Sequence, residues 1–185
     1  MDFPHFKTPR LTLDALSLGD SEALLSIFSQ PDVVKYYDIE AYSSIEQSNA
    51  LINFFNQRYV DGLGIRWAIR HTDSGELIGT CGFNSWNKKM QNAGIGYELS
   101  STAWGKGYAT EALRWIITAA FSNDLPLGSL YRIQGDTMLG NTASESVLKK
   151  LGFREEGIRR GSGFWKNEYH DLKCFGLIKP DFKVV

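Results

Sequence analysis

The sequence has few cysteines and no long hydrophobic run. Its two cysteines, Cys81 and Cys174, form no CxxC or Cys/His spacing, so neither a zinc site nor a disulfide framework is expected. This cysteine usage fits a reducing, cytoplasmic setting. The most apolar stretch, residues 115–121, is far shorter than the roughly 18 residues of a membrane span. The first residues lack the apolar segment of a signal peptide, and we expect no membrane partner and no metal.

The chain also lacks an excess of charge of either sign. Lys and Arg total 20 against 21 Asp and Glu, a formal net charge of -1. A general nucleic-acid binder carries a net basic surface, so no nucleic-acid partner is expected. With 43% hydrophobic and 22% charged residues, the composition is that of a globular protein. No linker, repeat or low-complexity tract divides the 185 residues, and we expect a single domain over residues 1–185.

The order of the hydrophobic patterns indicates a mixed α/β domain. Alternating apolar residues predict strands at 11–15, 65–70, 76–83, 93–99, 130–134, 153–158 and 169–178. A first helix is predicted from Asp20 to Pro31, and a third helix follows Gly107. Capping-box spacing predicts a second helix at Ser44 with Gln47, and a fourth at Thr142 with Glu145. This order mixes hairpins with crossovers, so the sheet should be mixed, with helices on both faces.

The most informative segment is a glycine-bearing loop at residues 104–110, WGKGYAT, which leads into an amphipathic helix. The first N–H groups of a helix lack intrahelical partners, and the helix dipole favours an anion there. Gly105 and Gly107 let a phosphate approach the backbone, and Lys106 adds a positive charge. The loop therefore favours a phosphate or pyrophosphate ligand, although a tight turn that binds nothing has the same composition.

Three phosphate-loop patterns can be compared with this segment. A Walker loop needs Ser or Thr after its lysine, whereas Lys106 is followed by glycine. The dinucleotide fingerprint has Thr110 where its third glycine should stand. The pyrophosphate loop of acyl-CoA transferases, (Gln/Arg)xxGx(Gly/Ala), matches at Gly107 and Ala109 and departs at Trp104.

Segments in order along the chain resemble the GNAT acyltransferase superfamily. The resemblance is carried by residues 93–99, AGIGYEL, and by residues 104–113, WGKGYATEAL. Further segments are similar to its ribosomal-protein N-terminal acetyltransferase branch: residues 8–11, 67–69, 75–79, 131–133, 141–144, 151–157 and 169–171. The resemblance implies the GNAT fold, a mixed and mostly antiparallel twisted sheet of about seven strands flanked by helices. It also implies a cofactor cleft between splayed central strands.

The resemblance further implies the activity and the cofactor. Acetyl-CoA would donate its acetyl group directly to a primary amine, and CoA would leave as product. The implied cofactor contacts are Leu99, Trp104, Gly105, Lys106, Gly107, Tyr108, Ala109, Thr110, Asn141 and Ser144. A backbone N–H at residues 97–99, where the family has a β-bulge, would stabilise the developing oxyanion. Asn141 matches an asparagine that binds the pantetheine arm, and a helix N-cap role explains the same residue.

The predicted catalytic residues are Glu98, Ser144 and Asn141. Ser144 matches a position that faces the cofactor sulfur, whereas the tyrosine acid of many family members is replaced here by Leu148. The glutamate that often serves as base is replaced by Gly94. Glu98 lies on the same face of a regular strand and is the candidate base. A water chain is the alternative, because an α-amine with a pKa near 8 is already partly neutral at neutral pH.

The acceptor is expected to be a protein or peptide N-terminal amine, by resemblance to the ribosomal-protein branch. The candidate acceptor-binding residues are Tyr36, Tyr37, Phe83, Trp86 and Asp171. Buried packing explains the aromatic residues about as well. Two other functions stay open: acetylation of a small-molecule amine or antibiotic, and a non-catalytic acyl-CoA-binding regulatory domain. The resemblance also allows a homodimer, for which the sequence specifies no interface.

Overall fold

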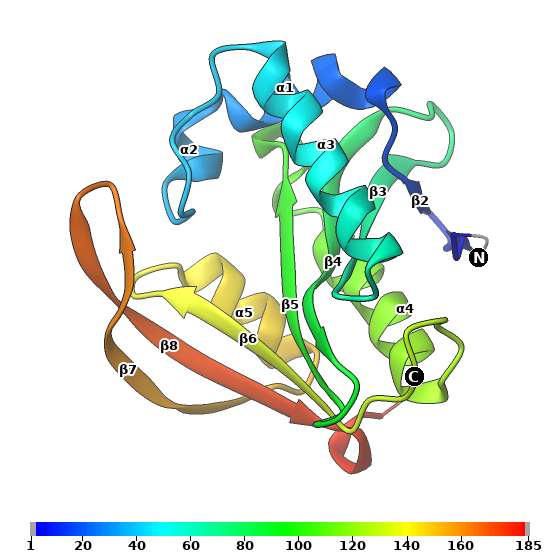
Figure 1. Ribbon diagram of the computed structural model, residues 1–185, viewed down its shortest axis with the longest axis vertical. Coiled ribbons are helices and arrows are strands. Elements are labelled where there is room, and N and C mark those ends of the chain that lie inside the picture. The colour runs from blue at the N-terminus through cyan, green and yellow to red at the C-terminus, as the bar shows by residue number, and fades with distance from the viewer. Residues whose placement is uncertain (1–2, 184–185) are drawn as a thin grey trace.

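The computed structural model describes residues 3–183, which form one mixed sheet flanked by helices (Figure 1). In the described residues the sheet has eight strands in the order β1-β2-β3-β4-β5-β6-β8-β7. The strands are β1 (Phe6–Lys7), β2 (Leu11–Ala15), β3 (Ile65–His71), β4 (Leu77–Asn87), β5 (Asn92–Leu99), β6 (Arg132–Met138), β7 (Arg154–Trp165) and β8 (Glu168–Ile178). The predicted mixed, mostly antiparallel sheet is confirmed. The additional strand is β1, whose two residues are too few to show an alternating pattern.

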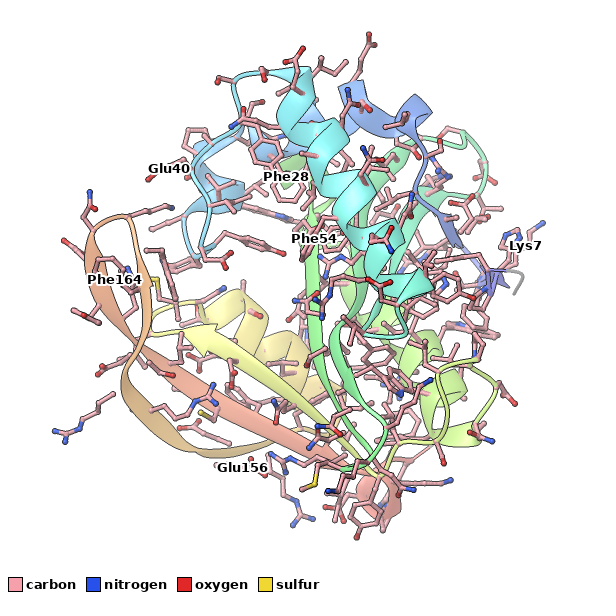
Figure 2. All side chains as sticks on the ribbon, in the orientation of Figure 1. Lys7, Phe28, Glu40, Phe54, Glu156 and Phe164 are labelled. Carbon is pink, nitrogen blue, oxygen red and sulfur yellow. The ribbon has the colours of Figure 1, made fainter. Side chains whose placement is uncertain are left out.

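Two layers of helices cover the sheet. The helices are α1 (Ser21–Phe28), α2 (Pro31–Val34), α3 (Ile45–Val60), α4 (Tyr108–Ser122) and α5 (Thr142–Lys150). One buried cluster packs α1 and α3 against the sheet, with Phe28, labelled in Figure 2, at its centre. The other and larger cluster packs α4 and α5 against the strands. The short helix α2 was not expected: Pro31 does not only follow α1 but begins α2, because proline fits the first turn of a helix.

Three of the four predicted helix starts are correct, since Asp20, Ser44 and Gly107 are the N-caps of α1, α3 and α4, and the fourth needs correction. The capping box of α3 is present, with Ser43 and Ser44 N–H groups donating to the Gln47 side chain at 2.8 and 3.1 Å. The capping box predicted from Thr142 is wrong. Asn141 is the N-cap of α5, and its side-chain oxygen accepts from the Ser144 N–H at 3.2 Å. Asparagine is the stronger N-cap residue, and the partner predicted for Thr142 is engaged elsewhere.

The two halves of the sheet separate between β5 and β6. These strands pair in parallel at three positions only, ending where Gly94 pairs with Gln134. On its other edge β5 stays paired with β4 up to the contact of Leu99 with Gly79. Figure 1 shows β5 and β6 diverging beyond this point. One edge of residues 95–99 therefore has no strand partner among the described residues, which confirms the expected opening between splayed central strands.

A β-bulge lies on the neighbouring strand rather than at the expected place. Residues 97–99 of β5 pair regularly with β4, so the bulge expected there is wrong. The register shifts instead between Phe83 and Ser85 of β4, which leaves Asn84 as the extra residue. Gly96 accommodates it, because a Cβ at that position would lie 2.4 Å from Asn84 Nδ2. The bulge is on β4, so β5 keeps its alternation and Gly94 and Glu98 share a face, as predicted.

Candidate active site

Two neighbouring cavities open at the point where β5 and β6 separate. The larger cavity has a volume of about 530 Å³ and lies between the N-terminus of α4, the end of β5 and α5. The smaller cavity, of about 240 Å³, lies between β6, the β7–β8 hairpin and the segment around α2. The residues that line both are Tyr36, Tyr37, Tyr97, Asn141 and Ser144. Two ligands, one in each cavity, would therefore meet at these five side chains.

The glycine loop forms one end of the larger cavity. Gly105 and Gly107 have φ angles of 72° and 81°, which L side chains rarely adopt. Gly107 is the N-cap of α4 and has no side chain to bond the first N–H groups of the helix. These N–H groups are thus free for an anion that lies in the cavity. The arrangement fits a pyrophosphate, as the sequence predicts.

Arg10 holds this loop in place, a role that the sequence did not reveal. Its guanidinium donates to the Lys106 carbonyl at 2.9 Å and to the Glu111 carboxylate at 2.6 Å. It also lies 4.6 Å from the ring centre of Tyr108. Burial alone would raise the pKa of Glu111, but hydrogen bonds from Thr8 and Arg10 outweigh this effect, and the pKa lies below its ordinary value. Arg10 is 96 residues before Lys106, so no local pattern could have connected the two.

The larger cavity gathers nearly all the predicted cofactor residues. Those that line it are Leu99, Trp104, Gly105, Gly107, Tyr108, Ala109, Thr110, Asn141 and Ser144. Lys106 does not line it, so the structure does not bring its charge to the cavity. Two lysines that were not predicted, Lys35 and Lys150, do line it. Surface lysines are common, and only the fold shows which ones converge on a cavity.

A tyrosine and a serine hydroxyl meet at the junction of the cavities. The Tyr97 hydroxyl and Ser144 Oγ are 2.7 Å apart, and the phenol also lies 3.2 Å from the Ser144 carbonyl. Burial raises the pKa of Tyr97 to about 12, although the bond from Ser144 opposes this. The phenol therefore keeps its proton at neutral pH and can donate it. The sequence pointed to Ser144 and to the loss of the tyrosine acid at Leu148, but not to this replacement hydroxyl on β5.

Glu98 lies in a buried ion-pair network. Its carboxylate accepts bonds from Arg66, Thr80 and Tyr37, and the Glu98 and Arg66 side chains are only 3% and 2% exposed. Burial alone would lower the pKa of Arg66, but the nearby Glu98 charge outweighs this effect, and the pKa lies above its ordinary value. Burial and the Glu98 charge also raise the pKa of Tyr37 above its ordinary value. With three donors on its carboxylate, Glu98 has the geometry of a partner for Arg66 rather than of a free proton acceptor.

Asn141 has two uses in this geometry. Its side-chain oxygen accepts the Ser144 N–H and so begins α5, as the capping alternative predicted. The same side chain lines both cavities, which leaves its amide group for a ligand. The two predicted roles are therefore compatible.

The predicted acceptor residues fall into two groups. Tyr36 and Tyr37 line both cavities, and the Tyr36 hydroxyl donates to the Gly140 carbonyl at 3.1 Å. Phe83 and Trp86 were predicted wrongly. They are 1% and 5% exposed, pack against each other in the core and line neither cavity. The bulge at Asn84 places both side chains on the same face of β4, where they join the larger apolar cluster, because both faces of this sheet are covered.

Asp171 also lies away from the cavities. Its carboxylate accepts the Gly161 N–H at 2.8 Å within the β7–β8 hairpin, and it lines neither cavity. The structure therefore assigns it to the hairpin instead of the acceptor.

Two other kinds of site are absent within residues 3–183. No helix there is long and apolar enough to cross a membrane. No group of three or more His, Cys, Asp or Glu side chains in that range is arranged to hold a metal ion.

Comparison with known proteins gives consistent matches over nearly the whole chain. Residues 10–154 match the acetyltransferase (GNAT) domain family. YoaA, an uncharacterized N-acetyltransferase of Bacillus subtilis (strain 168), is 36% identical over 178 residues, which are 96% of this chain and 98% of YoaA. YdaF of the same organism, named as a candidate ribosomal N-acetyltransferase, is 30% identical over 94% of this chain and 93% of its own length.

A solved structure supports the same fold. RimL, a ribosomal L7/L12 alpha-N-protein acetyltransferase in complex with coenzyme A, superposes with a TM-score of 0.84. It is 21% identical, and the match covers 95% of this chain and 98% of RimL. The domain match, the relatives and the open cleft at the glycine loop lead to one conclusion. The chain belongs to the GNAT family and is an N-acetyltransferase that uses acetyl-CoA.

Proposed function

We propose that the protein, as a single domain, acetylates the free α-amine of a protein or peptide N-terminus. One observation carries this proposal: the two cavities meet at the Tyr97–Ser144 hydroxyl pair. Such a junction suits a direct transfer, in which the two reactants are held side by side. The similarity to YdaF and the fold shared with RimL support an N-terminal amine as the acceptor.

The larger cavity would hold acetyl-CoA, which supplies an activated acetyl thioester. The free N–H groups at the start of α4 would bind its pyrophosphate, with Lys35 and Lys150 adding positive charge at the cavity. The unpaired edge of residues 95–99 would bind the pantetheine arm as a strand binds its neighbour, and Asn141 would donate its amide. A backbone N–H on this edge would also face the developing oxyanion.

The proton for the leaving sulfur would come from Ser144. Its hydroxyl lies at the junction, and the Tyr97 phenol, which is protonated at the start of the reaction, would replace the proton through their shared hydrogen bond and take one back from water. The acceptor amine loses its proton to water, because Glu98 is engaged by Arg66 and an α-amine has a pKa of about 8. A lysine ε-amine, with a pKa of about 10.4, would be a poorer acceptor here.

A direct assay separates this function from the alternatives. The purified chain is given acetyl-CoA with three acceptor sets: peptides with free N-termini, simple aliphatic amines or polyamines, and amino sugars. Release of CoA thiol is measured, and mass spectrometry locates the acetyl group. We expect acetylation of the peptide α-amine. Turnover with the small amines alone would show a small-molecule enzyme, and CoA binding without turnover on any acceptor would show a binding domain.

A further inference from the structure

Asn84 is an exposed residue that lines the smaller cavity. It is the extra residue of the β-bulge on β4, between Phe83 and Ser85. Bulges occur often beside active sites, where they redirect one side chain. Here the neighbouring Phe83 is buried in the core, whereas Asn84 remains exposed. The bulge therefore adds one polar residue to this wall of the cavity.

The orientation of the Asn84 amide is set by Arg66. Arg66 Nη1 donates to Asn84 Oδ1 at 2.8 Å, and a guanidinium can only donate, so the amide oxygen faces it. Nδ2 lies over Gly96, which also lines the smaller cavity, in the space that a Cβ would need. It donates to no group among residues 3–183. The backbone carbonyl of Asn84 is engaged by Arg58 at 2.6 Å, so the amide NH2 is the polar group left for a ligand.

A buried ion pair holds this amide from behind. The Arg66 side chain is 2% exposed, donates to the Thr80 hydroxyl at 2.7 Å and pairs with Glu98. Glu98 in turn accepts from the Tyr37 hydroxyl, and Tyr37 lines the smaller cavity as Asn84 does. Each charge of the pair thus holds one residue of the cavity wall, Arg66 holding Asn84 and Glu98 holding Tyr37. This makes Arg66 a positioning residue for the Asn84 amide.

The chemistry of this amide indicates which group of the acceptor stands next to its amine. An NH2 group only donates, so its partner has to be a hydrogen-bond acceptor. Gly96, under the amide, directly precedes Tyr97, whose hydroxyl lies at the junction of the cavities. A peptide N-terminus places a neutral carbonyl oxygen next to its amine. A polyamine or an alkylamine offers no such oxygen.

The charges that line the smaller cavity limit the acceptor further. Asp38 and Asp136 line it, and no Lys, Arg or His side chain does so in the described part of the chain. Asp136 shares its charge with Arg159, whereas Asp38 has no ion-pair partner among those residues. A free amino acid could offer Asn84 only a carboxylate, which the two aspartates repel. The neutral carbonyl of a peptide fits both the donor and the lining.

We propose that Asn84 selects peptide N-termini by donating its amide N–H to the first carbonyl of the acceptor. The inference rests on the proposed function and adds a residue that sets its specificity. Asn84 lines the smaller cavity and not the larger one, so it does not hold acetyl-CoA. Its loss should raise the KM for a peptide and leave the affinity for CoA unchanged.

The test compares two acceptors and two variants. The acceptors are alanylalanine amide, which has the carbonyl, and n-butylamine, which lacks it. Asn84→Asp keeps an oxygen toward Arg66 but replaces the donor by a second oxygen, and Asn84→Ala removes the donor without adding charge. We expect KM for the peptide amide to rise roughly fivefold to tenfold in N84A, the loss of one hydrogen bond, and further in N84D. KM for n-butylamine and the Kd for CoA should not rise.

Asn87→Asp is the matched control, because it makes the same chemical change on the same strand. Asn87 accepts the Met90 N–H at 2.9 Å through its side-chain oxygen and lines neither cavity, so both KM values should stay at those of the parent chain. If n-butylamine is not turned over, its inhibition constant against the peptide replaces its KM. Thermal melting checks the fold, and Tm should change little because Asn84 is exposed.

Each other outcome overturns the inference. A rise of the peptide KM in N84D alone would show a charge effect, and a rise in N84A alone would show that only the bond to Arg66 matters. An equal rise for both acceptors, or a weaker affinity for CoA, would show a disturbed fold. If the parent chain acetylates peptides and both variants keep its KM values, the inference fails while the proposed function stands. If the parent chain acetylates n-butylamine and no peptide, both fail.

Discussion

Replacing Glu98 by glutamine separates a structural role from a catalytic one. The change keeps the shape of the side chain but leaves the Arg66 guanidinium without an opposite charge, at 2% exposure. Removing one partner of a buried ion pair costs about 3–5 kcal/mol, because the remaining charge is uncompensated. Thr80 and Tyr37 donate to different carboxylate oxygens, so glutamine can accept only one of these bonds, and its NH2 group can donate to the other hydroxyl. Because neither hydroxyl is left without a partner, we take the lower end, about 3 kcal/mol. For a chain of this size that corresponds to a Tm lower by roughly 6–12 °C.

The measurement is urea unfolding and thermal melting of E98Q, with a second variant that tests the cause. Adding Arg66→Met removes the unpaired buried guanidinium, so the double variant should recover most of the lost stability. Glu155→Gln is the surface control. Its carboxylate is 43% exposed and lies 3.6 Å from Lys149 and 3.9 Å from Lys173, and the loss of these long pairs should cost less than about 1 kcal/mol.

The kinetic profile decides between the two roles. If Glu98 only neutralises Arg66, the ratio of E98Q to parent kcat should stay constant across pH at temperatures where both are folded. A variant that keeps its Tm yet loses kcat most strongly at low pH, where the amine needs a base, would refute this reasoning. Glu98 would then be the general base.

Three further predictions use other parts of the structure. Gly107→Val should raise the Kd for CoA at least tenfold by calorimetry, because φ is 81° and the new side chain would lie against Arg10, whose Nη2 is 3.5 Å from the Cβ position, so that the loop would have to shift. Gly75→Val, with φ of 70° in open space, carries similar backbone strain, and an equal loss of CoA affinity in that variant would contradict the loop assignment. Tyr97→Phe should lower kcat by about 10²-fold with little change in the Kd for CoA. Because burial raises the pKa of Tyr97 to about 12, the rate of the parent enzyme should not decrease as the pH is raised to 10. An unchanged kcat in Tyr97→Phe would show that the phenol takes no part in the reaction. Burial also raises the pKa of Cys81 to about 12, so a thiol reagent at pH 8 should label only the half-buried Cys174 in the native protein. Labelling of both cysteines without denaturant would show that the core around Cys81 opens.

Local sequence patterns predicted most of the elements because their signals lie within a few residues. Alternation gave β3 and β5, and the Ser44–Gln47 spacing gave the start of α3. Short elements escaped for the same reason. The two residues of β1 and the four of α2 are too few to show a period. Tertiary contacts, not propensity, hold them in place.

The candidate site was only partly predictable because its decisive contacts join distant residues. Arg66 and Glu98 are 32 residues apart and meet only when β3, β4 and β5 are in register. The sequence could place Glu98 on the correct face but could not supply its partner. Phe83 illustrates the opposite error. Alternation shows that it faces one side of the sheet, but both sides are covered and only the fold tells core from cleft.

The three paired positions between β5 and β6 have a mechanical consequence. Strands β1 to β5 form one lobe of the sheet and β6, β8 and β7 the other, and this short parallel ladder is their sheet contact. Side-chain bonds also cross between the lobes, among them those from Tyr36 to Gly140 and from Lys166 to Val34. A ligand in the larger cavity would contact both lobes, because residues of β5 and of α5 line that cavity. Binding there would therefore connect the two lobes next to the smaller cavity.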